Sequence, residues 1–402
     1  MIFKDSYLNN KGYKMAIRKI DYDSVRGKYV LLRDDFNVQI VDGKILDSFR
    51  IDASMPTIKH LISNGARVVI CAHLGRPGGR RDETLSLRPI AEYINVPFVD
   101  DCLKKDFLSD MKNGDIVLME NLRFHIGEEE NDDAFARELA AGFDIYVNDA
   151  FAVSHRAAAS LVGVTKYLPS FAGDLLMGEI ENISHVLENP EHPFVAFVGG
   201  AKVSSKINVL KKLVTVADKL VVGGAMGTTF NFALGAPVGN SLYEPEMADT
   251  VIEIMNIAKQ NGCEVLLPLD KGVGKTFDKN ARRENRDVDK IRDDDVIIDD
   301  GDKTIERNHE ILADAKTVIW NGTFGMAEWG DVWGKSSFAL ARDLAHYTKM
   351  GKIKSVVGGG ETVAALDVCG VHKDMSYVST GGGAFLEFIE GKSLPGITAL
   401  EN

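Results

Sequence analysis

The stretch F-V-A-F-V-G-G-A-K, residues 194–202, decides how this chain of 402 residues is expected to fold. It joins a run of apolar residues directly to paired glycines and a lysine. Near-continuous apolar runs are typical of parallel strands that are buried on both faces of a sheet. Glycines after such a strand let backbone N–H groups approach an anion closely. The stretch therefore predicts a parallel strand followed by a phosphate-binding turn.

The same pattern recurs along the whole chain. The second half has further β-branched runs at 218–222, 264–267, 316–320, 353–357 and 376–378, and the first half has them at 29–32, 67–72, 115–119 and 143–147. Helical stretches separate these runs, as in βαβ units. Because the chain is longer than one core usually grows, we predict an α/β fold with two Rossmann-like parallel-sheet domains.

A helix is expected to join the two domains. Apolar residues between Asp174 and Glu188 recur at spacings of three and four, and Asn189-Pro190 ends the pattern. The predicted organisation is therefore an N-terminal domain at 1–173 with a polar extension at 1–14, an interdomain hinge helix at 174–189, a C-terminal domain at 190–384 and a terminal segment at 385–402.

Composition excludes several classes of function. The net charge of -12 argues against binding to nucleic acids or membrane surfaces, because both are polyanions. No apolar run is long enough to span a membrane, and the opening segment lacks the apolar core of a signal peptide. The cysteines are widely spaced without a C-x-x-C pair, which indicates reduced thiols rather than disulfides or zinc. We expect a soluble, cytoplasmic protein with a local basic cluster for any anionic ligand.

The first half places arginines directly after its strands. Ligands of open parallel sheets bind outside the carboxyl ends of the strands. The post-strand segments R-D-D-F-N, H-L-G-R-P, E-N-L-R-F-H and N-D-A-F-A-V-S-H-R supply Arg33, Arg76, Arg123 and Arg156. Guanidinium groups match carboxylate and phosphate oxygens, so their convergence would hold a small, multiply charged acid. Asp35 and Asn37 lie on one side of an extended run and could bind hydroxyl groups.

The second half places glycines at the equivalent positions. Its post-strand segments are G-G-A-K, G-G-A-M-G, N-G-T-F-G, G-G-G-E-T and T-G-G-G-A-F. Lys202 and Lys206 are four residues apart on a helix that we expect to begin at G-G-A-K, so both ammonium groups would lie on one face. This arrangement predicts a polyphosphate site.

Familiar nucleotide motifs fail at single positions. The three G-K-S/T steps have Leu269, Trp329 and Leu386 where a P-loop requires its first glycine. The dinucleotide pattern G-x-G-x-x-G fails at Val363 and again at Leu386. A two-domain nicotinamide dehydrogenase is therefore a disfavoured alternative.

The segments R-D-D-F-N-V, H-L-G-R-P, E-N-L-R-F-H, N-D-A-F-A-V-S-H-R, G-G-A-K-V-S-S-K, W-N-G-T-F-G, G-G-G-E-T and S-T-G-G-G-A-F resemble the phosphoglycerate kinase family in identity and order, from about Ile17 to Ala399. The resemblance implies reversible transfer of the acyl phosphate of 1,3-bisphosphoglycerate to MgADP, giving ATP and 3-phosphoglycerate in glycolysis and gluconeogenesis. It also implies a monomer, hinge closure around the helix at 174–188, and packing of the residues after about Phe385 onto the first domain.

The resemblance assigns roles to residues. It implies that Asp35, Asn37, Arg50, His73, Leu74, Gly75, Arg76, Arg123 and Arg156 bind the phosphoglycerate, whereas Arg33 does not. It implies that Gly200, Ala201, Lys206, Gly223, Gly224, Asn321, Glu328, Gly358, Gly359, Gly360, Glu361 and Thr362 bind ADP or ATP, with Glu361 as the Mg²⁺ ligand. Arg50, Lys202, Gly360 and Gly382 would act in catalysis.

Four residues depart from the family pattern. Glu361 stands where the family usually has Asp, and the longer side chain is expected to weaken the metal site. Asp34 replaces an apolar residue on the side of the strand that carries Leu32 and Phe36, so its burial should cost stability. Ala152 and Thr323 replace Gly and Pro. A related binding protein without turnover is the second alternative, and retention of Arg50 with Lys202 argues against it.

Overall fold

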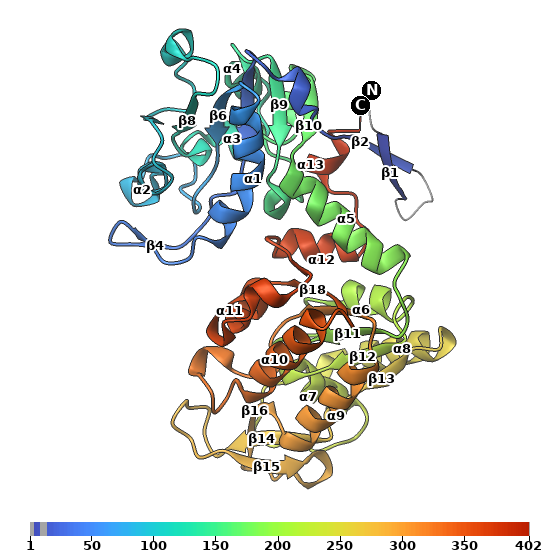
Figure 1. Ribbon diagram of the computed structural model, residues 1–402. Coiled ribbons are helices and arrows are strands. Elements are labelled where there is room, and N and C mark those ends of the chain that lie inside the picture. The colour runs from blue at the N-terminus through green and yellow to red at the C-terminus, as the bar shows by residue number, and fades with distance from the viewer. Residues whose placement is uncertain (1–3, 9–13, 402) are drawn as a thin grey trace. The chain divides into compact units, whose positions relative to one another are not determined.

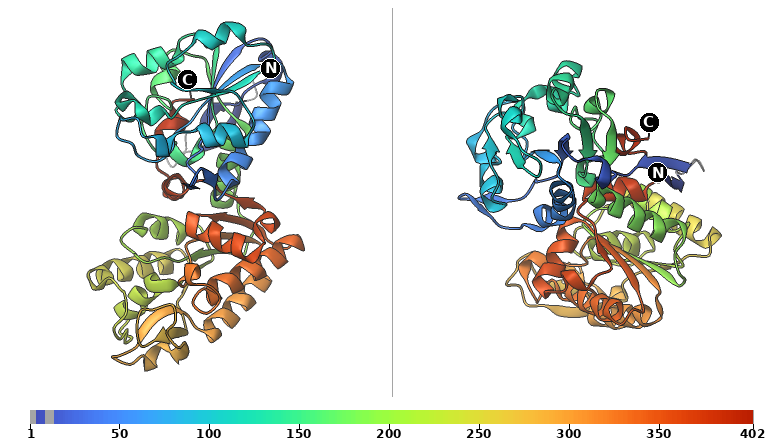
Figure 2. Two further views of the ribbon diagram at one scale, coloured as in Figure 1. Left: turned by 90° about the vertical axis from the view of Figure 1, so that its left-hand side faces the viewer. Right: turned by 45° about the horizontal axis from the view of Figure 1, so that its top comes forward.

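The computed structural model describes residues 4–8 and 14–401 of the chain (Figures 1 and 2). Two compact units make up the chain: residues 1–181 with 391–402 form the first, and residues 182–390 form the second. Each unit contains a six-stranded parallel sheet with helices packed beside it, so the predicted α/β class is confirmed. All ten predicted strands are present, and no end differs from the expected one by more than two residues.

The sheet of the first unit has the strand order β10-β9-β3-β6-β8-β7, and every neighbouring pair is parallel. In β3, every residue from Val30 onward is buried, as expected of a strand covered on both faces. The strands are β3 (Tyr29–Arg33), β6 (Arg67–Cys71), β7 (Phe98–Val99), β8 (Ile116–Met119), β9 (Ile145–Asn148) and β10 (Ser170–Ala172).

Two helices of this unit share a hydrophobic core with the sheet. Ile58 and Leu61 of α1 (Phe49–Ser63) and Ile90 of α2 (Arg88–Tyr93) belong to one buried cluster with strand residues such as Leu32 and Ile70. The shorter helices are α3 (Ile126–Glu129) and α4 (Asp133–Ala140). The core therefore packs α1 and α2 against β3 and β6.

The sheet of the second unit has the order β13-β12-β11-β17-β18-β19, again with parallel neighbours. Counted along the chain within this sheet, that order is 3-2-1-4-5-6, the arrangement of Rossmann folds. The strands are β11 (Phe194–Val198), β12 (Lys219–Val222), β13 (Glu264–Leu266), β17 (Thr317–Asn321), β18 (Lys354–Gly358) and β19 (Tyr377–Val378).

Helices α9 (Asp302–Asp314), α10 (Lys335–Lys349) and α11 (Gly360–Cys369) contribute Leu312, Leu344 and Leu366 to one core with Phe197 and Trp320 of the sheet. Helix α8 (Ala248–Gln260) contacts both α6 (Ile207–Leu213) and α7 (Gly224–Ala233), and α12 (Gly383–Ile389) contacts α6. Figure 1 shows α9 and α10 side by side.

A three-stranded antiparallel sheet between β13 and β17 was not predicted. It has the order β15-β14-β16, from β14 (Asp270–Gly274), β15 (Glu284–Asp287) and β16 (Val296–Asp300). The sequence of β14, D-K-G-V-G, contains two glycines and two charges, so propensity disfavours a strand there. Tertiary contacts overrule the local preference.

Two further strand pairs are antiparallel: β1 (Lys4–Leu8) pairs with β2 (Lys14–Arg18), and β4 (Ile40–Val41) pairs with β5 (Lys44–Ile45).

Helix α5 (Asp174–Glu188) spans the predicted residues, and the division between the two units falls within it, between Glu181 and Asn182. The last residues of the chain belong to the first unit and include α13 (Pro395–Thr398). There Gly396 donates its N–H to Ser154 O at 2.8 Å and accepts a hydrogen bond from Asn148 Nδ2 at 3.0 Å.

The cysteines at positions 71, 102, 263 and 369 are free thiols. Across residues 4–8 and 14–401, no helix is both long and apolar enough to cross a membrane.

Candidate functional site

Two glycine turns meet at the carboxyl ends of β11 and β17. The strand order reverses between these neighbours, because β11 leads to β12 on one side and β17 leads to β18 on the other. Gly199 N–H donates to Asn321 O at 3.0 Å, and Gly200 N–H donates to Thr323 O at 2.9 Å. Ligands of doubly wound sheets bind at such a reversal point. The fold therefore brings together, at this reversal point, segments that are more than a hundred residues apart.

A cavity of about 120 Å³ opens at this point. Its lining includes the predicted nucleotide residues Gly200, Ala201, Gly224, Glu328 and Glu361. The remaining lining residues are Ala225, Leu242, Phe277, Ile297, Ile298, Thr323, Phe324, Gly325 and Met326. An apolar wall beside glycine turns suits a ligand with a flat ring and a polyphosphate chain. Sequence reasoning missed the apolar wall, since its members come from several loops and one strand with no shared motif.

Lys206 lies beside the two glycine turns. Its Nζ donates to Gly199 O at 2.8 Å and to Asn321 O at 3.4 Å, and a Cβ on Gly322 would come within 2.7 Å of it. Burial lowers the pKa of Lys206 to about 8, and the Glu361 carboxylate opposes that shift. A half-buried ammonium group with few acidic neighbours is well suited to a phosphate.

The prediction for the helix that carries the two lysines was wrong. Helix α6 begins at Ile207, and Lys206 precedes it as the N-cap residue. Residues 203–206 form a turn because Lys206 N–H bonds Val203 O and Ser204 bonds the Glu244 carboxylate with both its N–H and its hydroxyl. Lys202 is therefore outside the helix and exposed, so the two lysines are not one helical turn apart.

The G-G-G-E-T turn is locked to the neighbouring strand. Asn321 Nδ2 donates to Gly358 O at 2.7 Å, and Thr362 Oγ1 accepts the N–H of Gly322 at 2.7 Å. Gly359 has φ +101°, and a Cβ there would lie 2.6 Å from Asn321 Nδ2, so only glycine fits. Asn321 and Thr362 are thus buried supports of the turn. Helix α11 starts at Gly360 without a side-chain cap, which leaves backbone donors at its N-terminus.

Glu361 offers a carboxylate at the wall of the cavity, in the first turn of α11. Mg²⁺ prefers oxygen ligands and is usually held by one or two carboxylates together with substrate phosphates. An exposed Glu361 beside a phosphate-binding turn fits that requirement. The residues present are therefore compatible with Mg²⁺ bound together with a nucleotide.

A buried histidine in the first unit lies among arginines. His73 is 1 % exposed, and burial lowers its pKa well below the usual value, helped by Arg33, Arg123, Arg50 and Arg156. Arg33 Nη2 lies 3.2 Å from His73 Nδ1. Because a guanidinium group can only donate, Nδ1 accepts and Nε2 carries the proton of the neutral ring. Arginine cations around one neutral ring are chemically suited to an anionic ligand.

Hydrogen bonds join several predicted substrate residues. Arg50, in the first turn of α1, donates to Asp35 Oδ2 at 2.9 Å and to Asn37 O at 3.2 Å. Asn37 Oδ1 accepts the N–H of Gly75 at 2.9 Å, and Arg123 donates to Gly75 O at 2.7 Å. The structure therefore brings Asp35, Asn37, Arg50, His73, Gly75 and Arg123 together, with Leu74 buried beside them. Arg76 and Arg156 are exposed.

Arg33 does not take part in the expected convergence at the strand ends. Its guanidinium group is 1 % exposed and donates to Ser160 Oγ at 2.8 Å and to Asp34 O. Ser160 in turn bonds the buried Glu128. The interpretation of Arg33 as a ligand at an exposed edge, made from strand position alone, was wrong, because contacts remote in sequence draw it into the interior.

Asp34 is fully buried, as expected from its position between Leu32 and Phe36. Neither of its carboxyl oxygens has a hydrogen-bond partner within the residues that the structure describes. Burial raises the pKa of Asp34 well above its usual value; the nearby Asp149 carboxyl adds to the effect, and the Ser54 hydroxyl and Arg33 partly oppose it. The expectation of an unpaired buried carboxyl at this position is confirmed.

A second group of possible metal ligands lies in the first unit. Ligand atoms of Asp101, Cys102 and His125 lie within 4.8 Å of one another. His125 Nε2 already pairs with Asp101 Oδ1 at 3.2 Å, and burial raises the pKa of the Cys102 thiol well above its usual value. The His125–Asp101 pair accounts for this group without an ion.

These features define a class: a two-unit α/β protein with a nucleotide-type cavity in one unit and an arginine-rich anion site in the other. The sequence matches the model of the phosphoglycerate kinase family over residues 19–392. It is 46% identical over 395 residues to a phosphoglycerate kinase of Rhodospirillum centenum and 44% identical to one of Granulibacter bethesdensis, covering 96% of this chain and 100% of each relative.

Solved structures agree with the sequence relatives. The fold is similar to that of a phosphoglycerate kinase from Coxiella burnetii, with a TM-score of 0.84 and 40% identity over 94% of this chain and 96% of that one. The Pyrococcus horikoshii enzyme gives a TM-score of 0.80 at 29% identity, with the same coverage of both chains. The chain belongs to the phosphoglycerate kinase family.

Proposed function

We propose that the chain catalyses the reversible transfer of the acyl phosphate of 1,3-bisphosphoglycerate to MgADP, which gives ATP and 3-phosphoglycerate. The observation that carries this proposal is the chemical contrast between the two units. One unit has arginines around a neutral histidine, and the other has glycine turns and Lys206 around a cavity with an apolar wall. The first chemistry suits a small phosphorylated acid and the second suits a nucleotide.

For the phosphoglycerate, we assign binding to the connected group around His73. Asp35 and Asn37 would bind the hydroxyl group, and the guanidinium groups of Arg76, Arg123 and Arg156 would bind the phosphate and carboxylate oxygens. Arg50 is held by Asp35 at 2.9 Å, so its guanidinium group is oriented before substrate arrives. Prior orientation reduces the entropy lost on binding.

For the nucleotide, we assign the phosphates to Lys206 and to the turns at Gly200, Gly322 and Gly359. Glu328 on the cavity wall would bind the ribose hydroxyl groups. Glu361 would hold Mg²⁺, which neutralises charge on the nucleotide phosphates when it is bound. Asn321 and Thr362 would fix the shape of the phosphate-binding turns.

The reaction needs no general base, because the attacking oxygen of a carboxylate or a diphosphate is already anionic. Catalysis then depends on positioning and on neutralising charge in the transition state. We assign that task to Arg50 and Lys202, with backbone N–H groups at Gly360 and Gly382. Arg50 and Lys202 belong to different units. We therefore propose that α5 acts as a hinge that lets both groups reach one phosphoryl group.

A coupled assay with MgATP and 3-phosphoglycerate tests this function, with Lys202→Ala as the decisive variant. We expect a loss of kcat on the order of a hundredfold or more, since a transition-state cation is removed. Lys259→Ala changes an exposed lysine of α8 in the same unit and is expected to retain full activity. Turnover that is absent in the parent, or unchanged in Lys202→Ala, would contradict the proposal. ADP binding without turnover would favour a related binding protein.

The monomeric state and cytoplasmic location expected of a glycolytic enzyme stay predictions.

A further inference from the structure

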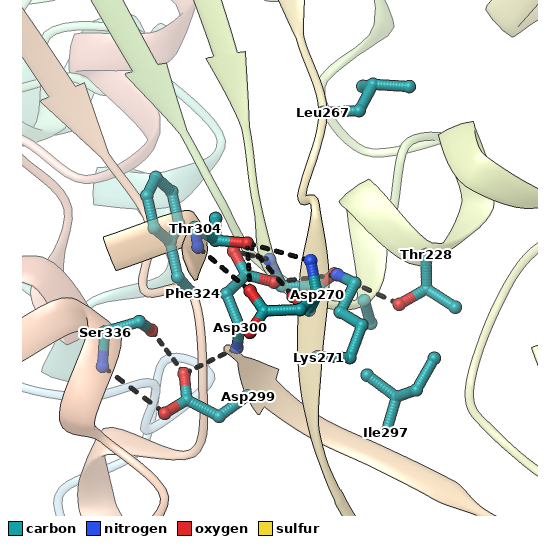
Figure 3. A network of polar contacts seen from close by, with 12 residues as sticks. Thr228, Leu267, Asp270, Lys271, Ile297, Asp299, Asp300, Thr304, Phe324 and Ser336 are labelled. Carbon is teal, nitrogen blue, oxygen red and sulfur yellow. Dashed lines mark hydrogen bonds and ion pairs between the residues drawn. The ribbon is translucent and has the colours of Figure 1, made fainter. Parts of the chain in front are cut away.

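A fully buried ion pair lies behind the nucleotide cavity. Lys271 of β14 and Asp300 at the end of β16 are 0 % and 1 % exposed, and Lys271 Nζ lies 2.7 Å from Asp300 Oδ1 (Figure 3). Removing two charges from water costs about as much as their attraction returns, so an apolar pair would often serve stability equally well. We therefore expect the pair to have a role other than stabilising the fold.

The pair forms hydrogen bonds with both the N–H and the C=O of Gly224. Lys271 Nζ donates to Gly224 O at 3.2 Å, and Gly224 donates its N–H to Asp300 Oδ2 at 3.4 Å. Gly224 has φ +67°, lines the cavity and begins α7. A Cβ on the preceding Gly223 would come within 2.7 Å of Asp300 Oδ2, so the turn packs directly on the carboxylate. The pair thus fixes the glycine turn from behind.

The same strand supports the cavity at other points. Ile297 and Ile298 of β16 line it two or three residues before Asp300. The Asp299 carboxylate accepts the N–H of Asp300 at 2.9 Å and the hydroxyl group of Ser336, as Figure 3 shows, and it is paired with Arg283 at 2.6 Å. A Cβ on Gly325, another lining residue, would lie 2.2 Å from Asp299 Oδ1. The end of β16 is therefore a rigid support from which successive residues reach different walls of one cavity.

We propose that the Lys271–Asp300 pair positions the Gly223–Gly224 turn for nucleotide binding and so sets the affinity for ADP and ATP. The two side chains are positioning residues, because they act through the backbone of Gly224. This inference rests on the proposed function in one respect, the identity of the ligand as an adenine nucleotide.

The decisive variant is Lys271→Met with Asp300→Leu, since it removes both charges and leaves none unpaired in the interior. We expect it to fold with a melting temperature close to the parent value. Its KM for ADP should rise on the order of tenfold, because Gly224 loses its two hydrogen bonds to the buried pair. Its KM for 1,3-bisphosphoglycerate should stay within about twofold, since that substrate is assigned to the other unit.

A matched control removes an exposed ion pair of the same unit. Lys335 Nζ lies 2.7 Å from Asp302 Oδ1, and both side chains are about half exposed. Lys335→Met with Asp302→Leu should leave both KM values unchanged. A folded Lys271→Met/Asp300→Leu protein with parental affinity for ADP would overturn the proposal. So would an equal rise in both KM values, because it would indicate a general structural effect.

Direct titration of each protein with ADP separates this inference from the proposed function. A parent that binds ADP without turnover would contradict the function, and the dissociation constants would still decide the role of the pair. A parent that does not bind ADP would contradict both. If the double variant does not fold, Lys271→Met with Asp300→Asn provides the test, because it keeps the shape of the Asp300 side chain and leaves no charge unpaired in the interior. We then expect a rise in KM for ADP alone, and a parental value would refute the role.

Discussion

The affinity for ADP should fall as the pH rises from 7 to 9, because Lys206 loses its charge in that range. Its Nζ lies against the glycine turns, 2.8 Å from Gly199 O, and burial lowers its pKa to about 8. A lysine with a lowered pKa is charged below that value and neutral above it. Lys206 can therefore pair with phosphate oxygens at pH 7, and by pH 9 most molecules have lost this interaction.

The magnitude follows from the titration of one group. With a pKa of about 8, roughly nine-tenths of Lys206 is charged at pH 7 and roughly one-tenth at pH 9. If only the charged form binds well, the dissociation constant for ADP rises about tenfold, or about 1.4 kcal/mol. Binding at pH 9 should also take up close to one proton, since the phosphates restore the charge.

Calorimetric titration with ADP at pH 7, 8 and 9, repeated in buffers with different ionisation enthalpies, measures the affinity and the proton uptake together. Lys206→Arg should abolish the pH dependence between 7 and 9, because a guanidinium group stays charged there. Lys259→Ala should keep the parental slope. A flat profile in the parent, or an undiminished slope in Lys206→Arg, would refute the reasoning.

Two further predictions concern the departures from the family pattern. Asp34→Val should raise the free energy of unfolding by about 1–3 kcal/mol at neutral pH, because it removes a buried carboxyl without hydrogen bonds. The pKa of Asp34 is raised in the fold, so the parent protein loses stability as the pH rises above 4. The gain in melting temperature from Asp34→Val should therefore be larger at pH 8 than at pH 4. No gain at either pH would contradict this prediction. Glu361→Asp should lower the Mg²⁺ concentration for half-maximal rate about two- to tenfold, and an unchanged Mg²⁺ dependence would show that the extra methylene group is harmless.

Sequence reasoning predicted the local elements well because their signals are local. The apolar run at 194–198 becomes β11, and the pattern from Asp174 to Glu188 becomes α5 with the same ends. The glycines after the strands indicated a phosphate site, and the cavity lies beside several of them. Periodicity and turn chemistry depend on neighbours in the chain, so they can be read without the fold.

Tertiary structure alone decided the environment of each charged side chain. Arg33 ends β3 and Arg123 follows β8 by four residues, yet Arg33 turns inward to Ser160 and Arg123 bonds the turn at Gly75. Lys271 and Asp300 are 29 residues apart, and only the unexpected sheet of β14–β16 brings them together behind Gly224. The arginines after the strands of the first half and the glycines after the strands of the second half can be recognised from the sequence alone. Burial and pairing of charges depend on partners distant in sequence, so only the fold determines them.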